Sequence, residues 1–339
     1  MILALNCGSS SLKYAAFDGE RRVSGGSVGG IGLPGGHATH ADAVHAALAA
    51  LDRPDAVGHR LVHGGPDLLE PVQVDARVMA QLREAIPFAP LHLPPALGAI
   101  EAVAQRYPDV PQVACFDTAF HRTLPAVART FALPARVEAL GVRRYGFHGL
   151  SCEWAVSQLR LRGRAVIAHL GNGASLTAVR DGVSVDTTMG LTPAGGIMMG
   201  TRSGDLDPGV LVFLLETMSR EEIARLVDRE SGLLGVSGAT SDMKALLESA
   251  EPRARLAVEM FCYQARKAVG ALAAALGGLD ALVFTGGIGE HAAPVRERIC
   301  AGLGHLRSFA VHVLAADEEQ VIARHVRELA GGSTPPRAG

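Results

Sequence analysis

Two polar, glycine-containing turns bring together the kinds of group that bind phosphate. The first is Asn6–Ser11, with the sequence Asn-Cys-Gly-Ser-Ser-Ser and with Lys13 shortly after it; the second is Gly171–Ser175, with the sequence Gly-Asn-Gly-Ala-Ser. Closely spaced backbone N–H groups and hydroxyls in such turns can hold phosphate oxygens. The first turn is not a Walker loop, because Lys13 falls inside a strand pattern and not at the start of a helix. We interpret the pair as candidate polyphosphate contacts, with a plain hairpin turn as the alternative.

A third glycine-rich turn, Gly286–Glu290, follows an expected strand and precedes a helix expected to start at Pro294. A strand, a glycine-rich turn and a helix N-terminus in succession favour an anion or nucleotide site. Glycines in this position also allow a helix to pack closely on a strand, so the pattern by itself leaves both interpretations open.

Three clusters place arginine or histidine beside glycine in turn-like surroundings, and one acidic residue, Asp117, ends an apolar strand pattern. Arginine binds carboxylate or phosphate through two parallel hydrogen bonds, and a carboxylate at a strand end can hold a metal. The structural alternatives are a surface ion pair for an arginine, a core position for a histidine and a turn cap for Asp117. The clusters are His59–Gly65, Arg144–Gly149 and Gly200–Asp205.

Apolar runs alternate with helical patterns along the whole chain, which indicates an α/β protein. The glycine-rich stretch Ser24–Gly36 is expected to be a loop. Ser219 with Glu222, and Asp317 with Gln320, have the spacing of capping boxes. The expected strands are Ile2–Leu5, Leu12–Phe17, Val113–Phe116, Ala165–Leu170, Leu176–Val179 and Leu282–Thr285, and the expected helices are Ala41–Leu51, Ala96–Arg106, Cys152–Arg160, Glu221–Arg229, Arg253–Leu276 and Glu318–Leu329.

One segment near the N-terminus is echoed in the middle of the chain. Residues 2–19 lie without a gap over residues 165–182, and the two segments share a glycine in the turn and an Asp-Gly pair at the end. A repeat of this spacing suggests a duplicated domain, with two similar hairpins arising by chance as the alternative. If the domains are duplicated, their turns can face each other across a cleft and hold one polyphosphate.

Composition excludes several classes of protein. The 339 residues carry a formal charge of −2, so there is no basic field to attract nucleic acid or an anionic membrane. The five cysteines are scattered and form no Cys-x-x-Cys pair, which disfavours a disulfide scaffold or a zinc site. The most apolar stretch, Ala268–Leu279, is shorter than the roughly 20 residues needed to span a bilayer. We therefore expect a cytoplasmic protein that binds neither nucleic acid nor membrane.

These motifs, in this order, resemble the acetate kinase family of the actin and sugar-kinase superfamily over nearly the whole chain. Asn6–Lys13 and Arg144–Ser151 look like that family's two signatures. The resemblance implies an α/β fold of two duplicated ribonuclease-H-like domains with a cleft between them. It implies an N-terminal domain of residues 1–118 joined by a C-terminal helix at about 317–330, a nucleotide-binding domain of residues 119–316, and a disordered tail at 331–339.

The resemblance also implies roles for individual residues. Asn6 and Glu318 would hold the metal, and Asp117, Arg202, His148 and Arg60 would be catalytic. Arg60 would also bind the acetate carboxylate. The remaining substrate-binding residues would be Val62, Leu91, His92, Phe147 and Pro193, and the nucleotide would be bound by Ser9, Ser11, Lys13, His169, Asn172, Gly173, Asp242, Met243, Lys244, Gly287, Ile288 and His291.

The activity implied by the resemblance is reversible, Mg²⁺-dependent phosphoryl transfer from ATP to acetate, directly and in line, by a homodimer; Mn²⁺ is an alternative metal and a phosphoenzyme an alternative route. The chain departs from the family pattern at Cys152, at Met243-Lys244 and at His291. The last two departures lie at the expected nucleoside wall and leave GTP or pyrophosphate open as donors. Propionate or butyrate stays open as acceptor, as does a nucleotide-dependent clamp without catalysis.

Overall fold

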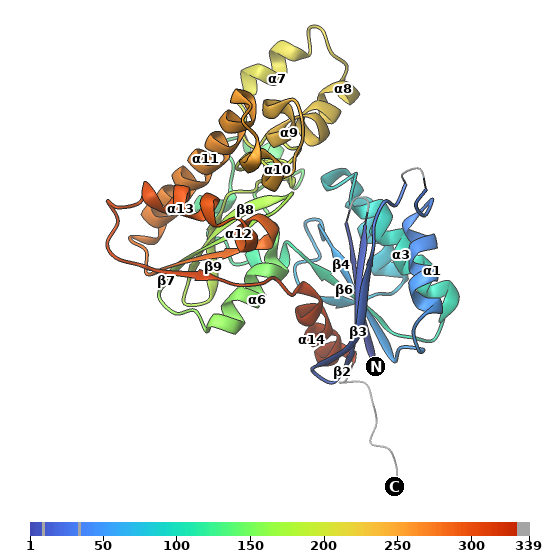
Figure 1. Ribbon diagram of the computed structural model, residues 1–339. Coiled ribbons are helices and arrows are strands. Elements are labelled where there is room, and N and C mark those ends of the chain that lie inside the picture. The colour runs from blue at the N-terminus through green and yellow to red at the C-terminus, as the bar shows by residue number, and fades with distance from the viewer. Residues whose placement is uncertain (9–10, 33–34, 331–339) are drawn as a thin grey trace. The chain divides into compact units, whose positions relative to one another are not determined.

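The computed structural model describes residues 1–8, 11–32 and 35–330 (Figure 1). Contacts divide the chain into two compact units: Met1–Phe120 together with the segment that begins at Asp317, and His121–Ala316. The predicted phosphate contact Ser9 and the predicted disordered tail at 331–339 lie outside the described residues.

In the part of the chain that the structure describes, the first unit has a six-stranded sheet in the order β3-β2-β1-β4-β6-β5. Strands β1, β2 and β3 form an antiparallel meander, whereas β1, β4 and β6 are parallel and β5 is antiparallel to β6. The strands are β1 (Ile2–Cys7), β2 (Leu12–Asp18), β3 (Arg21–Val28), β4 (Ala56–Leu61), β5 (Val72–Gln73) and β6 (Gln112–Phe116).

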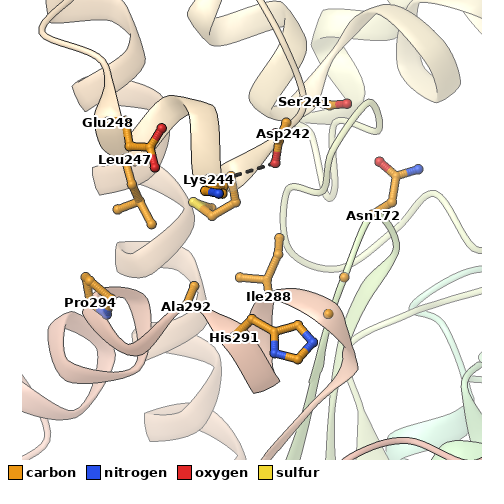
Figure 2. Close-up of a pocket in the computed structure, with 13 residues that line it drawn as sticks. Asn172, Ser241, Asp242, Lys244, Leu247, Glu248, Ile288, His291, Ala292 and Pro294 are labelled. Atoms are coloured by element: carbon orange, nitrogen blue, oxygen red, sulfur yellow. Dashed lines mark hydrogen bonds between the residues drawn. The ribbon is translucent and has the colours of Figure 1, made fainter.

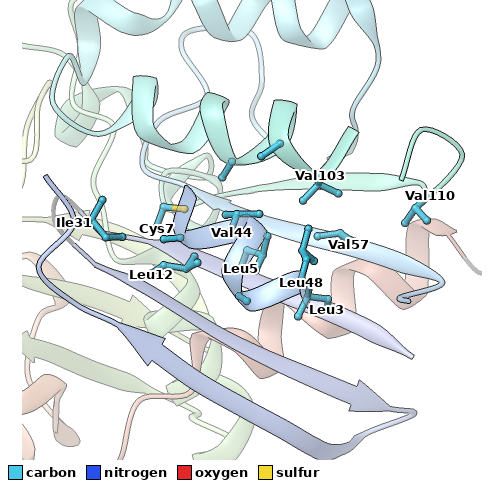
Figure 3. Close-up of a cluster of buried hydrophobic side chains, with 14 residues drawn as sticks. Leu3, Leu5, Cys7, Leu12, Ile31, Val44, Leu48, Val57, Val103 and Val110 are labelled. Carbon is cyan, nitrogen blue, oxygen red and sulfur yellow. The ribbon is translucent and has the colours of Figure 1, made fainter. Parts of the chain in front are cut away.

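Helices cover both faces of this sheet, which explains why β1 is apolar on both sides. One face packs against α1 (His40–Ala49) and α3 (Leu93–Arg106) through side chains that include Leu5, Val44 and Val103 (Figure 3). The other face packs against α14 (Glu318–Ala330), which contacts β1, β4 and β6. The unit also contains α2 (Ala76–Glu84) and a 3-10 turn at Ile86–Phe88.

The approach of α14 to the sheet depends on a glycine. A Cβ atom at Gly58 in β4 would lie 2.4 Å from Ile322 Cγ2 and 2.6 Å from Val326 Cγ2. Both of these α14 side chains are fully buried. Glycine at this position therefore sets how closely the helix can lie on the strand, and with it the position of Glu318 at the start of the helix.

The described part of the second unit has a five-stranded sheet in the order β11-β10-β7-β8-β9. The long helix α11 (Pro252–Leu276) packs against β7, β8 and β9, and α9 and α10 pack on α11. The strands are β7 (Arg164–Leu170), β8 (Ala174–Arg180), β9 (Val183–Thr187), β10 (Ala281–Thr285) and β11 (Ala310–Val313), and the other helices are α4 (Ala126–Arg129), α5 (Ala135–Glu138), α6 (Gly149–Leu159), α7 (Pro208–Leu214), α8 (Arg220–Arg225), a π-helical turn at Leu226–Glu230, α9 (Gly232–Ser237), α10 (Met243–Glu248), α12 (Gly286–His291) and α13 (Ala293–Ala301), with a 3-10 turn at Ala119–His121 where the units join.

The two sheets share one plan, an antiparallel meander followed by two parallel strands on the other side of the first strand. The repeated segments 2–19 and 165–182 form the β1–β2 and β7–β8 hairpins. Their turns differ by one residue, because Cys7 pairs with Leu12 whereas Leu170 pairs with Ala174. The internal repeat thus corresponds to equivalent hairpins in equivalent sheets.

Three local expectations were wrong. Ser24–Gly36 was expected to be a loop, but its first part belongs to β3, where Gly25 and Gly26 leave room for the main chain and ring of Tyr14 in β2. His59–Leu61 is not turn-like but ends β4. The segment Gly286–Glu290 is not a turn but part of the short helix α12, whereas the helix expected from Pro294 is present as α13, which starts at Ala293.

Helix ends follow local rules. Helix α3 begins at Leu93, before the expected Ala96, because prolines in a first turn remove no helical hydrogen bond. Ser219 and Glu222 form the expected capping box. Asp317 accepts the N–H of Gln320, but the Gln320 side chain donates to the carbonyl of Glu20, so this box is half formed. No helix among the described residues is long and apolar enough to cross a membrane.

Candidate active site

In the first unit, three polar side chains lie where the parallel strands β1, β4 and β6 end. Asn6 and Arg60 are near the ends of β1 and β4, and Asp117 directly follows β6. The carboxyl ends of parallel strands are the usual location of binding sites in open α/β sheets. Arg60 donates from Nε to Asp117 Oδ1 at 3.0 Å, from Nη2 to Asp117 Oδ2 at 2.5 Å and from Nη1 to Asn6 Oδ1 at 3.2 Å.

The first turn of α14 adds two carboxylates to this cluster. Asn6 Nδ2 donates to Glu318 at 2.9 Å and to Glu319 at 3.1 Å, and Arg60 Nε lies 3.5 Å from Glu318. Burial disfavours the charge on Arg60, but Asp117, Glu318 and Glu319 outweigh burial and raise its pKa. Glu319 is also paired with Arg22 at 3.6 Å, so the cluster holds the three carboxylates of Asp117, Glu318 and Glu319 against two guanidinium groups.

The other site residues predicted in the first unit lie around these strands. Val62 follows β4 and is 5% exposed, and the half-buried Leu91 and His92 directly precede α3. Ser11 precedes β2, and Lys13, which pairs with Asn6 across the strands, is exposed. His59 is a core residue: it is hydrogen-bonded to Gln112 at 2.7 Å, and burial lowers its pKa to about 4.

In the second unit, two predicted histidines stack on each other. The rings of His148 and His169 have centroids 4.2 Å apart and an interplanar angle of 17°. His148 precedes α6 with φ 57°, a left-handed conformation that is uncommon for a non-glycine residue. His148 Nδ1 is hydrogen-bonded to Ser175 Oγ at 2.9 Å, and His169 Nδ1 to Ser151 Oγ at 2.8 Å. Both ring orientations are thus fixed from the protein side.

The stacked histidines and Arg202 surround glycines of the neighbouring loops. A Cβ at Gly173 would lie 3.1 Å from His148 Nε2 and 3.3 Å from Arg202 Nη1. A Cβ at Gly286 would lie 3.1 Å from His169 Nε2. Because a Cβ would be crowded at both positions, glycine is what lets the nitrogen atoms of these three side chains lie close against the loops.

Arg202 is held within its loop. Its Nη1 donates to the carbonyl of Pro193 at 3.1 Å. Burial raises the pKa of Asp228, while the charge of Arg202 acts in the opposite direction. The two aspartates nearest to Arg202 in the sequence accept hydrogen bonds from backbone N–H groups. Asp205 accepts from Gly196, and Asp207 accepts from Gly209.

A pocket of about 760 Å³ lies beside this group (Figure 2). Figure 2 shows Asp242, Lys244, Leu247 and Glu248 of the α10 region on one wall and Ile288 and His291 of α12 on the other. Asp242 caps α10 by accepting the N–H of Lys244. Seven of the predicted nucleotide-binding residues line the pocket: Asn172, Asp242, Met243, Lys244, Gly287, Ile288 and His291.

Two predicted residues of the acyl pocket, Phe147 and Pro193, are buried in the second unit. The Phe147 carbonyl accepts from His121 Nε2 at 3.0 Å. Arg144, from one of the cationic clusters, has a structural role, because its Nη1 donates to the carbonyls of Thr187, Thr188 and Met189.

Comparison with known proteins places this chain in a family. The model of the acetokinase family matches residues 34–326. An acetate kinase of Rhodopseudomonas palustris is 43% identical over 394 aligned positions, which cover 98% of this chain and 99% of that protein. The chain belongs to the acetokinase family. Two solved structures are similar to this chain, and each match covers 97% of this chain and 99% of the other. One is an acetate kinase of Porphyromonas gingivalis, with 38% identity and a TM-score of 0.85. The other is a propionate kinase of Francisella tularensis, with 34% identity and a TM-score of 0.90.

These comparisons confirm the family and the α/β fold that were predicted from the motifs. The alignment with the relative from Rhodopseudomonas palustris is longer than the 339 residues of this chain, so that relative contains segments that this chain lacks. The motif analysis placed Ser175 in a polar turn and Ser151 at the end of a signature, but it did not predict that they contact His148 and His169. It missed Glu319, which meets Asn6 only after folding.

For an acetokinase-family chain, the metal to consider is Mg²⁺. Among the described residues, no group of three or more histidines, cysteines or acidic residues could hold a metal alone. Mg²⁺ normally takes one or two carboxylates and completes its shell with water and substrate phosphates. Asn6, Asp117 and Glu318 offer such hard oxygen donors, and the excess of carboxylates in their cluster favours a cation. The residues present therefore fit a Mg²⁺ ion that completes its shell with water and substrate oxygens.

Proposed function

We propose that this chain is an acetate kinase, a phosphotransferase that moves a phosphoryl group reversibly between ATP and a carboxylate. The observation that carries the proposal is the convergence of His148 Nε2 and Arg202 Nη1 on the backbone of Gly173, beside the pocket of the second unit. Phosphoryl transfer requires little covalent assistance and depends on positioning and on neutralising charge. Those two groups supply both functions.

The donor is bound by the second unit, and residues 119–316 are the nucleotide-binding domain in this proposal. The nucleoside occupies the pocket lined by Asp242, Met243 and Ile288, and the phosphates extend along the glycine loops towards His169. Met243 is only 4% exposed, so it offers an apolar edge and no stacking surface. Lys244 cannot stack on a base as a planar guanidinium can. We therefore expect weak discrimination between ATP and GTP.

The acceptor carboxylate is bound by Arg60. Arg60 uses three of its five N–H groups in hydrogen bonds to described residues, which leaves two for a substrate. In the forward reaction an acetate oxygen forms a bond to the γ-phosphorus while the bond from that phosphorus to the ADP oxygen breaks. The products are acetyl phosphate and ADP. Mg²⁺ would be held by Asn6 and Glu318, with Asp117 beside them, and would neutralise phosphate charge.

Hydroxylamine trapping of the acyl phosphate tests this function. The purified chain is incubated with Mg²⁺ and acetate in parallel reactions containing ATP, GTP or pyrophosphate. We expect hydroxamate with ATP and GTP, and loss of product when EDTA removes the metal. Product with pyrophosphate alone would contradict the nucleotide assignment. Absence of product with every donor would leave the non-catalytic clamp as the better function.

Longer acyl acceptors are the second candidate within this chemistry, and the propionate kinase among the structural relatives favours testing them. One methylene group in an apolar pocket changes discrimination by only about 1–3 kcal/mol. We expect acetate to exceed propionate and butyrate in kcat/KM, because the buried Val62 limits the depth of the pocket. A higher kcat/KM for butyrate than for acetate would contradict this choice.

We also infer a homodimer that works in the cytoplasm. Helix α7 and the residue after it expose apolar side chains, with Val212 64%, Phe213 73% and Leu215 58% exposed, and a surface of this kind supports a protein–protein contact. Light scattering should give the mass of a dimer for the wild type and a lower mass for Phe213→Asp.

The inference of a cytoplasmic location is supported by the cysteines. All five are free, as in a reducing compartment.

A further inference from the structure

The loop that carries Arg202 is hydrogen-bonded to the end of a neighbouring helix with an uncommon geometry. That end is the π-helical turn that directly follows α8. The Thr201 hydroxyl donates to the carbonyl of Asp228 at 3.0 Å. The Ser203 N–H donates to the carbonyl of Val227, also at 3.0 Å. The residues on either side of Arg202 are therefore bonded to two consecutive carbonyls of one turn.

The start of α9 supplies the opposite kind of group to the same loop. The Leu233 N–H donates to the carbonyl of Met199 at 2.8 Å. Gly232 has φ 63°, in the left-handed region, and a Cβ there would lie 2.8 Å from the carbonyl oxygen of Arg202. Glycine at this position therefore allows α9 to begin in contact with the loop.

These bonds follow from what the ends of helices lack. The last carbonyls and the first N–H groups of a helix have no partner within it. The π-helical turn ends one helix and α9 begins the next, so the loop receives acceptors from the first and donors from the second. Burial raises the pKa of the Asp228 carboxyl, and the nearby charge of Arg202 opposes this effect. The guanidinium thus lies close to a helix C-terminus, where a positive charge is favoured.

We propose that Thr201 is a positioning residue, whose hydrogen bond to the π-helical turn keeps Arg202 where it meets the transferring phosphoryl group. The proposal rests on the proposed function, in which Arg202 acts on that group. Helical turns of the π type are rare and occur mostly at functional sites. Misplacing a catalytic group by about 1 Å can lower a rate about 100-fold. A loop that is bonded on both sides of Arg202 therefore contributes to turnover without touching the substrate.

The alternative is that the hydrogen bond of Thr201 only stabilises the fold. A bond from a hydroxyl to a carbonyl contributes to stability at many positions. Thr123 makes such a bond in the same unit, to the carbonyl of Ser184 at 3.0 Å. The two interpretations differ in whether the effect on turnover passes through Arg202. Thr123→Val is the matched control for Thr201→Val, because each change removes a hydroxyl and keeps a branched side chain.

Hydrogen exchange of the full chain, followed by mass spectrometry, tests the hydrogen bond without any assay of activity. The N–H of Met199 is bonded to the Arg202 carbonyl within the loop, and that of Ser203 to the π-helical turn. We expect peptides that contain residues 199–203 to exchange about 3- to 10-fold faster in Thr201→Val. In Thr201→Ser and Thr123→Val they should exchange as in the wild type. Unchanged exchange in Thr201→Val would overturn the proposal.

Kinetics test the consequence for Arg202. Loss of the hydrogen bond should lower kcat of Thr201→Val about 3- to 10-fold, with the KM for acetate changed less than about twofold. Thr201→Ser should recover most of the loss. In an Arg202→Ala background Thr201→Val should have almost no further effect on kcat, because no guanidinium is left to position. Thr123→Val should lower Tm and keep kcat in both backgrounds.

Additive losses of kcat in the double variant, or equal losses in Thr201→Val and Thr123→Val, would overturn the positioning role. A normal kcat of Thr201→Val beside a strongly impaired Arg202→Ala would refute the role of Thr201 and leave the proposed function intact. If exchange is faster as expected but Arg202→Ala retains full kcat, the positioning role fails together with the proposed function of Arg202, while the hydrogen bond itself stands.

Discussion

Arg60 and Asp117 form a two-point ion pair between the ends of β4 and β6, with hydrogen bonds of 3.0 and 2.5 Å. The Asp117 side chain is completely buried, and that of Arg60 is 14% exposed. Glu318 approaches the same guanidinium at 3.5 Å from α14. One arginine therefore joins the sheet, the C-terminal helix and the proposed acceptor site of the first unit.

Asp117→Asn should destabilise the protein strongly, because it leaves a buried guanidinium without its main counter-charge. Breaking a buried pair typically costs about 3–5 kcal/mol, and Glu318 should keep the value near the lower limit. Urea unfolding measures it. The double variant Arg60→Leu/Asp117→Leu should regain much of the stability and remain inactive. A double variant as unstable as the single one would contradict this account.

Arg202→Ala should lower kcat by about 10²–10³ and change the KM for acetate far less, because its charge acts on oxygens that become more negative during transfer. His148→Ala should have the same effect on a smaller scale. The same samples should show a Tm close to that of the wild type.

Arg225→Ala is the control for both variants, since Arg225 forms an exposed ion pair with Glu230 in the same unit. Its kcat should be unchanged. Folded Arg202→Ala and His148→Ala proteins with normal turnover would remove both residues from the catalytic set and favour the clamp.

Gly58→Ala should unfold or loosen α14, because its Cβ would lie 2.4 Å from Ile322. We expect a loss of stability above about 2 kcal/mol, in the range of overpacked cores, together with a higher Mg²⁺ requirement, since Glu318 moves with the helix. Gly98→Ala, in α3 with open space around it, should instead stabilise by about 0.5–1 kcal/mol. Equal effects of the two changes would be inconsistent with the proposed packing.

Val62→Ala should widen the range of acyl acceptors. Removing two methyl carbons from a side chain that is 5% exposed leaves space of about the size of an added methylene. The ratio of kcat/KM for propionate to that for acetate should rise about 10-fold, within the range of one methylene. An unchanged ratio with a lower Tm would mean that Val62 is only a core residue.

Acid should weaken folding through two buried histidines. The pKa of His59 and that of His121 are each lowered by burial from 6.5 to about 4. Between these values the unfolded chain binds protons that the folded chain does not, so stability is full above pH 6.5 and falls as the pH approaches 4. Each histidine should account for about 3 kcal/mol of the free energy of unfolding that is lost on acidification. Urea titrations at several pH values give the free energy of unfolding as a function of pH. This free energy should depend less steeply on pH for His59→Gln than for the wild type; an unchanged pH dependence would contradict the assignment.

The sequence predicted the elements whose apolar pattern was uninterrupted, such as β6 and α11. It did not predict β4, because Gly58, His59 and Arg60 interrupt the pattern for reasons of helix packing, core hydrogen bonding and the site. It also missed β3, an edge strand of glycine and serine that is defined by pairing with β2 and not by burial.

Seven of the residues that line the pocket beside α10 and α12 could be named in advance, because the chain resembles the acetate kinase family. The contacts that support the site residues could not. Ser175 and Ser151 lie 27 and 18 residues from the histidines they hold, and Glu319 lies 313 residues from Asn6. Such distances carry no periodicity, so only the folded chain brings these partners together.

The position of α14 in the chain has a consequence for synthesis on the ribosome. The first unit is made first, but α14, which covers one face of its sheet, follows the whole of His121–Ala316. At about 5–20 residues per second, that stretch takes on the order of 10–40 s. During this interval the nascent first unit has an uncovered apolar surface around Gly58 and lacks Glu318. Premature termination within the second unit should therefore give aggregating fragments rather than a working half-enzyme.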